Sequence, residues 1–174
     1  MVRPARAEDA GQIALVHVRS WQGAYRGLIP QAYLEGLDVA QRTQMWERTL
    51  AETEDPNAGV LVADEGGSVV GFVGYFPSRD PDADPGLVGE IGAIYLLPGA
   101  WGGGIGRRLM DAAIDRLAGA GFAQATLWVL DSNVRARRFY EAGGWSADGT
   151  AKQDDSRGFP LSEVRYRRSL PSLS

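Results

Sequence analysis

The residues with the clearest chemical meaning are a run of glycines followed by arginines, from Trp101 to Arg108. Pro98 stands just before the run, and an amphipathic stretch begins at about Gly104. Glycine lets the main chain approach an anion closely and present consecutive N–H groups to it. The first turn of a helix adds unpaired N–H donors and a partial positive charge, which Arg107 and Arg108 reinforce. The spacing therefore predicts a binding loop for a diphosphate.

Two common nucleotide-binding motifs do not match this loop. The dinucleotide motif G-x-G-x-x-G must end in glycine, but its last position is Arg107 when counted from Gly102 and Leu109 when counted from Gly104. A Walker A loop needs Gly-Lys-Ser or Gly-Lys-Thr, which does not follow here. On glycine content alone, a turn that simply starts a helix stays open as the alternative.

Composition excludes several other kinds of active site. The 174 residues include no cysteine and one histidine, His17, so a cysteine nucleophile and disulfides are excluded and a transition-metal site is not expected. The net charge of −4 argues against a nucleic-acid partner. No apolar run approaches the ~20 residues that span a bilayer, so no membrane partner is expected. The charged start has no apolar signal segment, which favours a cytoplasmic location.

Two linked stretches carry a family resemblance. Residues 90–110 run E-I-G-A-I-Y-L-L-P-G-A-W-G-G-G-I-G-R-R-L-M, and residues 130–145 run L-D-S-N-V-R-A-R-R-F-Y-E-A-G-G-W. The first resembles the acetyl-CoA motif of the GNAT superfamily of N-acetyltransferases, Q/R-x-x-G-x-G/A. The second is similar to the family's N-x-x-A-x-x-F/L-Y-x-x-x-G-F/W element. The resemblance covers residues 2–170 in the order of elements and is specific from Glu90 to Trp145.

The resemblance implies acetyl-CoA as the cosubstrate and residues that bind it. The main chain of Ile94, Tyr95 and Leu96 would pair with the pantetheine arm and polarise the thioester carbonyl. Asn133 would contact the cofactor, and the glycine loop would cradle the diphosphate. The loop residues concerned are Gly102, Gly103, Gly104, Ile105, Gly106 and Arg107. The family's Gln or Arg is Trp101 here, which removes one polar side chain but none of the backbone donors.

The same resemblance implies the catalytic residues. Tyr140 matches the usual general acid, whose phenol would protonate the departing thiolate of CoA. Glu90 matches an acidic position on the family's fourth strand and could take the amine's proton through water. A tyrosine packed under the sheet and an ordinary strand-end carboxylate are the alternatives. The glutamate base of ribosomal-protein N-terminal acetyltransferases corresponds to Trp128 here, which argues against their mechanism. Without cysteine, direct attack of the amine in a ternary complex is expected.

The acceptor implied is a primary amine of a small molecule or amino acid. A non-catalytic acetyl-CoA-binding module and a peptide or protein N-terminal acetyltransferase are the alternatives. Trp21 and Tyr25 belong to a segment that borders the acceptor site in this family, and homodimers are common in it. His17 shares the apolar stripe of that segment and is expected in the core. Residues 78–86 are expected to form a mobile loop, in which Asp80, Asp82 and Asp84 are either solvated or attract a cationic amine.

The elements that must position these residues follow from hydrophobic periodicity. Strands are predicted near residues 2–5, 60–64, 68–76, 88–97, 123–130, 145–150 and 161–168. Helices are predicted from about residue 7, with Gly27 and Pro30 interrupting the pattern, and near 39–50, 104–120 and 133–142. The expected fold is α/β (α+β), with a mixed, mostly antiparallel sheet of about seven strands flanked by helices. By resemblance its fourth and fifth strands are splayed, and residues 1–174 form one domain. In a regular strand, Glu90 would point to the face opposite Tyr95, and a bulge would change that.

Overall fold

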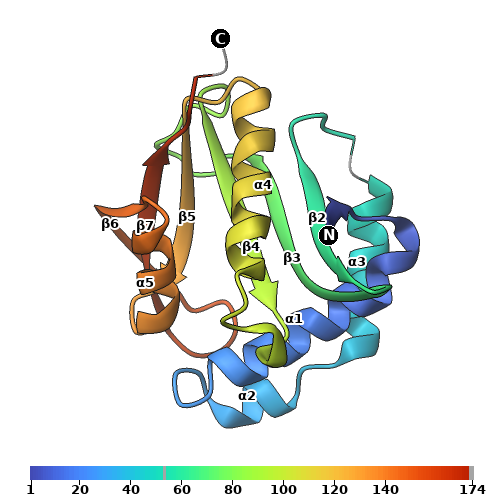
Figure 1. Ribbon diagram of the computed structural model, residues 1–174. Coiled ribbons are helices and arrows are strands. Elements are labelled where there is room, and N and C mark those ends of the chain that lie inside the picture. Colours follow the sequence, from blue (N-terminus) through green and yellow to red (C-terminus); the bar gives the residue numbers. More distant parts are fainter. Residues whose placement is uncertain (53, 173–174) are drawn as a thin grey trace.

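The sheet is the frame of the molecule. The computed structural model describes residues 1–52 and 54–172, and its seven strands lie in the order β1-β2-β3-β4-β5-β7-β6 (Figure 1). Neighbouring strands are antiparallel except β4 and β5, which are parallel. The mixed, mostly antiparallel sheet predicted from the sequence is therefore confirmed. The strands are β1 (Val2–Pro4), β2 (Gly59–Glu65), β3 (Ser68–Pro77), β4 (Val88–Leu96), β5 (Gln124–Leu130), β6 (Ser146–Asp154) and β7 (Leu161–Ser169).

Helices cover both faces of the sheet. One face carries α4 (Ile105–Gly119) and, beside it, α5 (Val134–Ala142), while α1 (Ala10–Ala24) and α3 (Val39–Glu52) pack on the other (Figure 1). A 3-10 turn at Ala7–Asp9 precedes α1. The short α2 (Gln31–Glu35) begins after Pro30, where the sequence predicted only an interruption.

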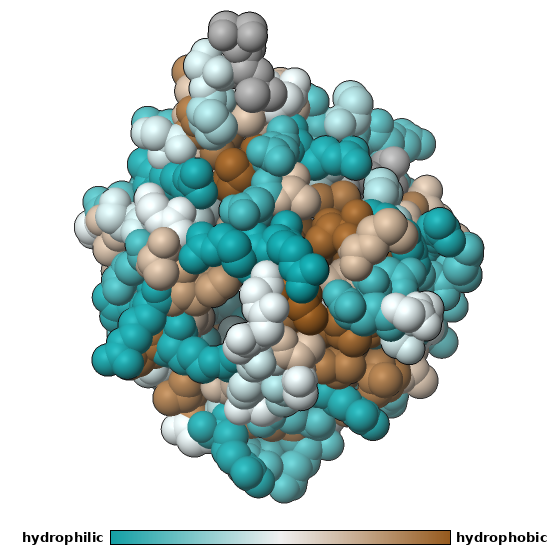
Figure 2. All heavy atoms as spheres, viewed as in Figure 1, coloured by the Kyte–Doolittle hydropathy of each residue, from teal (hydrophilic) through white to brown (hydrophobic). Residues whose placement is uncertain are grey.

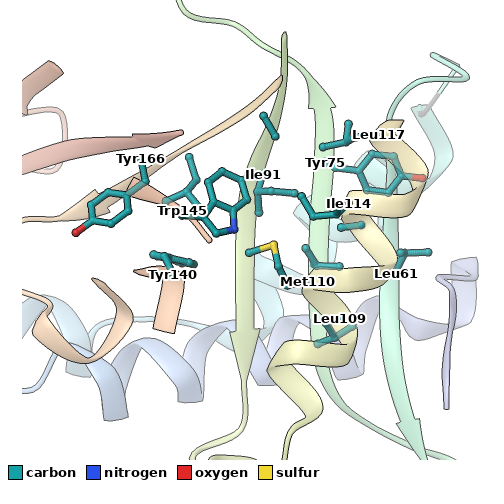
Figure 3. Close-up of a cluster of buried hydrophobic side chains, with 14 of the residues drawn as sticks. Leu61, Tyr75, Ile91, Leu109, Met110, Ile114, Leu117, Tyr140, Trp145 and Tyr166 are labelled. Atoms are coloured by element: carbon teal, nitrogen blue, oxygen red, sulfur yellow. The ribbon is translucent and has the colours of Figure 1, made fainter. Parts of the chain in front are cut away.

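The placement of α4 follows from its apolar stripe. Leu109, Met110, Ile114 and Leu117 are buried, and Figure 3 shows them pointing from α4 toward the sheet. Fully burying one such side chain stabilises the fold by about 2 kcal/mol. The stripe fixes the helix against β3 and β4, and so it fixes the position of the glycine loop at its start.

The two central strands separate part of the way along. The strands β4 and β5 pair only at Val88 with Gln124, Gly89 with Ala125 and Glu90 with Thr126. Beyond that point β5 stays paired with β7 as far as Leu130, and β4 stays paired with β3. A V-shaped gap therefore opens beyond Glu90, and the splayed strands implied by the family resemblance are present.

A β-bulge at Gly92 changes which face the end of β4 presents. Ile91 lies opposite Tyr75 and Ala93 opposite Gly74, so Gly92 is the extra residue. A side chain at Gly92 would collide with the ring of Phe76. Past the bulge, Tyr95 packs on the α1 side of the sheet, whereas Ile91 packs on the α4 side. Tyr95 thus shares the face of Glu90, which corrects the arrangement expected for a regular strand.

The lengths and polarity of the helices bear on whether any of them could cross a membrane. Within residues 1–52 and 54–172, none combines the length and the apolar character that a membrane crossing needs.

Candidate functional site

The gap between β4 and β5 opens into a cavity of about 680 Å³, a size typical of small-molecule sites. Figure 2 shows a hollow in this face, between the start of α4 and α5. The cavity brings together ten of the twelve residues predicted for the site. They are Glu90, Ile94, Tyr95, Leu96, Gly102, Gly104, Gly106, Arg107, Asn133 and Tyr140. Gly103 and Ile105 lie in the same loop and first turn but do not line the wall.

The glycine loop forms one end of the cavity. Gly102 and Gly104 have φ angles of 82° and 83°, which other residues adopt only with strain. A Cβ atom at either position would meet open space, so the loop presents bare main chain. Gly104 caps α4, and the helix's first main-chain bond runs from the N–H of Arg108 to the carbonyl of Gly104 (3.1 Å). The N–H groups of the three preceding residues have no acceptor within the helix and suit an anion.

Asn133 links the cavity to the helix that carries Tyr140. Its side-chain oxygen accepts a hydrogen bond from the N–H of Ala136 (3.2 Å), which caps α5. The residue is buried and lines the cavity. Asn133 therefore fixes the start of α5 and leaves its side-chain NH₂ group for other partners.

Tyr140 projects from α5 into the cavity wall. It lies among aromatic residues, with Trp145 and Tyr166 near its ring (Figure 3). Burial raises the pKa of Tyr140 well above its usual value of 10, so the phenol keeps its proton at neutral pH. A protonated phenol at the cavity wall suits a proton donor. The aromatic packing equally fits the alternative of a tyrosine packed under the sheet.

Glu90 lies where β4 and β5 separate. Its side chain is 9% exposed and accepts a hydrogen bond from the N–H of Arg79 (3.3 Å). Burial raises the pKa of Glu90 above its usual 4.5, the Arg79 hydrogen bond opposes that shift, and the charge of Asp80 adds to it. A buried carboxylate with a raised pKa is a better base than an exposed one.

The N-terminal helix supplies a further wall. Trp21 and Tyr25 line the cavity and pack edge-to-face at 4.9 Å. His17 lies outside the wall, where its ring stacks on Tyr95 at 5.5 Å and its Nδ1 accepts a hydrogen bond from Trp46 (3.3 Å). Burial lowers the pKa of His17 to about 4, so it is neutral at neutral pH. His17 is thus half-buried among aromatic rings and does not line the cavity, which is closer to the core interpretation than to a substrate contact.

The acidic loop is held against the sheet by one buried arginine. Arg165 of β7, 4% exposed, pairs bidentately with Asp82 (2.7 and 2.8 Å) and also contacts Asp80 (3.2 Å) and Asp148 (2.6 Å). Asp80 also accepts a hydrogen bond from Trp128 (3.0 Å). The loop is therefore tied down, and two of the three aspartates considered for amine attraction already have a cationic partner.

The cavity is also lined by charged side chains that were not predicted from the sequence. Glu163 lines the cavity next to Lys152 on the paired strand, and burial raises the pKa of Glu163. Arg157 pairs with Asp154 (2.9 Å), and both also line the cavity. The sequence signal that could have indicated Glu163 is strand alternation, which places residues 161, 163 and 165 on one face of β7.

With this geometry established, comparison with known proteins places the chain in a family. The model of the acetyltransferase (GNAT) family matches residues 21–145, and the chain belongs to this family of acyltransferases.

Several relatives are similar over most of the chain. The uncharacterized N-acetyltransferase YuaI of Bacillus subtilis is 36% identical over 165 residues, which cover 94% of this chain and 89% of the relative. An uncharacterized N-acetyltransferase of Archaeoglobus fulgidus is 35% identical over 139 residues, covering 80% and 88%. The mycothiol acetyltransferase of Frankia casuarinae is 36% identical over 98 residues, but these cover only 28% of that longer protein.

Solved structures share the fold. The PaiA N-acetyltransferase of Thermoplasma acidophilum, solved in complex with coenzyme A, has a TM-score of 0.77 at 19% identity, over 97% of this chain and 98% of its own. The putative acetyltransferase yncA of Salmonella typhimurium, solved with acetyl-CoA, has a TM-score of 0.71 at 20% identity, over 100% and 95%. At these identities the likeness supports the fold alone.

Proposed function

We propose that this protein is an acetyl-CoA-dependent N-acetyltransferase that acetylates a primary amine of a small molecule or amino acid. The observation that carries the proposal is the shared cavity: the glycine loop, the open edge of β4, Glu90 and Tyr140 all border one space. The bare main chain at Gly102 and Gly104 and the free N–H groups at the start of α4 fit the diphosphate of the cofactor.

Acetyl-CoA would supply the activated acetyl thioester. The main chain of Ile94, Tyr95 and Leu96 would pair with its pantetheine arm along the edge that β5 leaves free. Backbone N–H groups of β4 would polarise the thioester carbonyl, as an oxyanion hole does. The loop from Gly102 to Arg107, including Gly103 and Ile105, would hold the diphosphate, with Asn133 beside the cofactor.

Glu90 and Tyr140 would move the protons. The amine must be neutral to attack, and Glu90 would accept its proton through a water molecule. Tyr140 would donate its phenolic proton to the departing sulfur, since the phenol is protonated at neutral pH and lines the cavity. Direct attack needs both substrates bound at once, and the cofactor and the amine would bind in the same cavity.

Two measurements on the intact chain test the proposal. Acetyl-CoA should raise the melting temperature in a concentration-dependent way, since a ligand at 100 times its Kd adds about 2.7 kcal/mol of stability. No shift at millimolar acetyl-CoA would contradict cofactor binding. Release of free CoA should then be followed with polyamines, amino acids, aminoglycosides and peptides. Binding without turnover across this panel would favour the non-catalytic module.

A further inference from the structure

The first residue of the glycine loop is a tryptophan, where the family motif has Gln or Arg. Trp101 lines the cavity, and its indole N–H donates a hydrogen bond to the carbonyl of Leu96 at the end of β4 (3.3 Å). This bond ties the ring to the end of β4. An indole has no further polar atom to offer a phosphate.

A guanidinium group stacks on this ring. Arg135, in the first turn of α5, has its Cζ 3.5 Å from the centroid of Trp101, and it also lines the cavity. The contact is much shorter than the ~6 Å that limits a cation–π interaction. Stacking occupies the face of the guanidinium, whereas its five N–H donors lie in the plane and point away from the ring at the edge.

Arg135, like Arg107 of the loop, lacks the polar partners that three arginines near the cavity have within residues 1–52 and 54–172. Arg157 and Arg165 are in salt bridges with aspartates, and Arg137 donates to Tyr166 and to a main-chain carbonyl. Within residues 1–52 and 54–172, Arg135 makes no salt bridge. It is a charged group, held in place by an aromatic ring, beside a loop that suits an anion.

We infer that Arg135, held by stacking on Trp101, supplies the cationic side chain that the loop lacks at its first position, and that it binds the diphosphate of the cofactor. The inference rests on the proposed function for the identity of the ligand. Trp101 then positions Arg135. The side chain of Arg135, on α5, takes the place of the Gln or Arg that the family motif has at the position of Trp101.

Calorimetric titration with CoA tests this without requiring turnover. Arg135→Ala should weaken CoA binding about tenfold, because a charge-assisted hydrogen bond to phosphate is lost. Arg138→Ala is the matched control: Arg138 lies on the same helix, is exposed and is outside the cavity wall, so its loss should leave the Kd unchanged. Equal losses in both variants, or no loss in Arg135→Ala, would overturn the inference.

The role of Trp101 is tested by a double-mutant cycle. If Trp101 acts by holding Arg135, then Trp101→Leu weakens CoA binding in the parent protein and has little further effect in Arg135→Ala. Trp101→Phe keeps a ring for stacking and should retain most of the affinity. Fully additive losses would mean that the tryptophan acts independently, contrary to the inference. Circular dichroism and melting temperature confirm that each variant is folded.

A truncated cofactor shows which phosphate Arg135 contacts. With 3′-dephospho-CoA, the loss in Arg135→Ala should persist, since the diphosphate is still present. A loss seen with CoA but absent with 3′-dephospho-CoA would place Arg135 at the 3′-phosphate and overturn the diphosphate assignment. Failure of the parent protein to bind CoA would instead overturn the proposed function itself.

Discussion

The two ends of the cavity use arginine in opposite ways. At the end formed by the glycine loop, Arg107 and Arg135 line the cavity, and neither has a carboxylate partner within residues 1–52 and 54–172. Toward the other end, Arg165 lies behind Trp128 of the cavity wall, is almost fully buried and contacts three aspartates. Their aromatic neighbours do not distinguish them, since Arg107 lies near Phe139 and Arg165 near Trp128.

The difference lies in where the opposite charge comes from. A buried cation must be neutralised within the fold, and Arg165 is neutralised by the loop that it holds. A partly exposed cation at a cavity wall can stay unpaired in water and become paired only when a ligand arrives. The comparison therefore predicts that Arg165 contributes to stability, whereas Arg107 and Arg135 contribute to binding.

The largest effect should come from removing the buried arginine. Arg165→Met leaves Asp80 with little solvent and without a salt bridge in the described part of the chain and leaves Asp148 with Arg167 alone, which should lower the free energy of unfolding by about 3 kcal/mol. Arg107→Met should change it by less than about 0.5 kcal/mol, because no carboxylate in the described part of the chain pairs with Arg107. Urea unfolding of both variants measures the difference. Similar losses would show that the two ends are not distinct.

A large effect on turnover is expected from a change at Tyr140, which lines the cavity. Tyr140→Phe removes the phenolic proton but keeps the ring that packs against Trp145 and Tyr166. The turnover number should fall about 100-fold, the size typical of a lost general acid. The Kd for CoA should not change, because the ring remains in place. An unchanged turnover number would leave Tyr140 as a packing residue only.

The features predicted from the sequence are those with local signals. Gly102 and Gly104 require positive φ, Asn133 caps the helix three residues before Ala136, and the stripe of α4 repeats at helical spacing. Each feature is contained in a few neighbouring residues. These local rules gave the glycine loop and the elements around it to within a few residues.

The features missed depend on pairing across the fold. Arg165 and Asp82 are 83 residues apart, and no periodicity indicates their contact. Arg135 and Trp101 come from different elements in the same way. The bulge at Gly92, which the family resemblance allows for, adds one residue to β4 and moves Tyr95 to the face of Glu90, a change that strand alternation alone does not reveal. Strand register and charge pairing are set by the whole sheet.

A moderate effect is expected at Glu90, which faces the acceptor end. Glu90→Gln should lower kcat/KM about tenfold at neutral pH, less than the roughly 100-fold or more typical of direct proton transfer, because the base acts through water. In the parent protein the rate should fall as pH drops through the pKa of Glu90, which burial raises above 4.5, since only the ionised form accepts a proton. The glutamine variant should lose that limb of the pH profile.

Asp80→Asn extends this test to the loop held by Arg165. The charge of Asp80 raises the pKa of Glu90, so removing it should lower that pKa and move the acidic limb to lower pH. Asparagine keeps an oxygen for the hydrogen bond from Trp128. A limb that stays in place, or moves upward, would show that the loop does not influence the ionisation of Glu90.

The smallest effect, and the one that addresses both ends at once, is the response to salt. Raising NaCl from about 50 mM to about 500 mM should weaken CoA binding about threefold, because exposed charges are screened over a Debye length that shrinks below ~5 Å. The stability difference between the parent and Arg165→Met should be nearly constant over the same range, since a buried pair is screened far less. In Arg107→Met and Arg135→Ala, the salt dependence of binding should be shallower than in the parent. If the affinity for CoA and the stability difference of Arg165→Met depended equally on salt, the unpaired and the paired arginines would not differ physically in the way proposed.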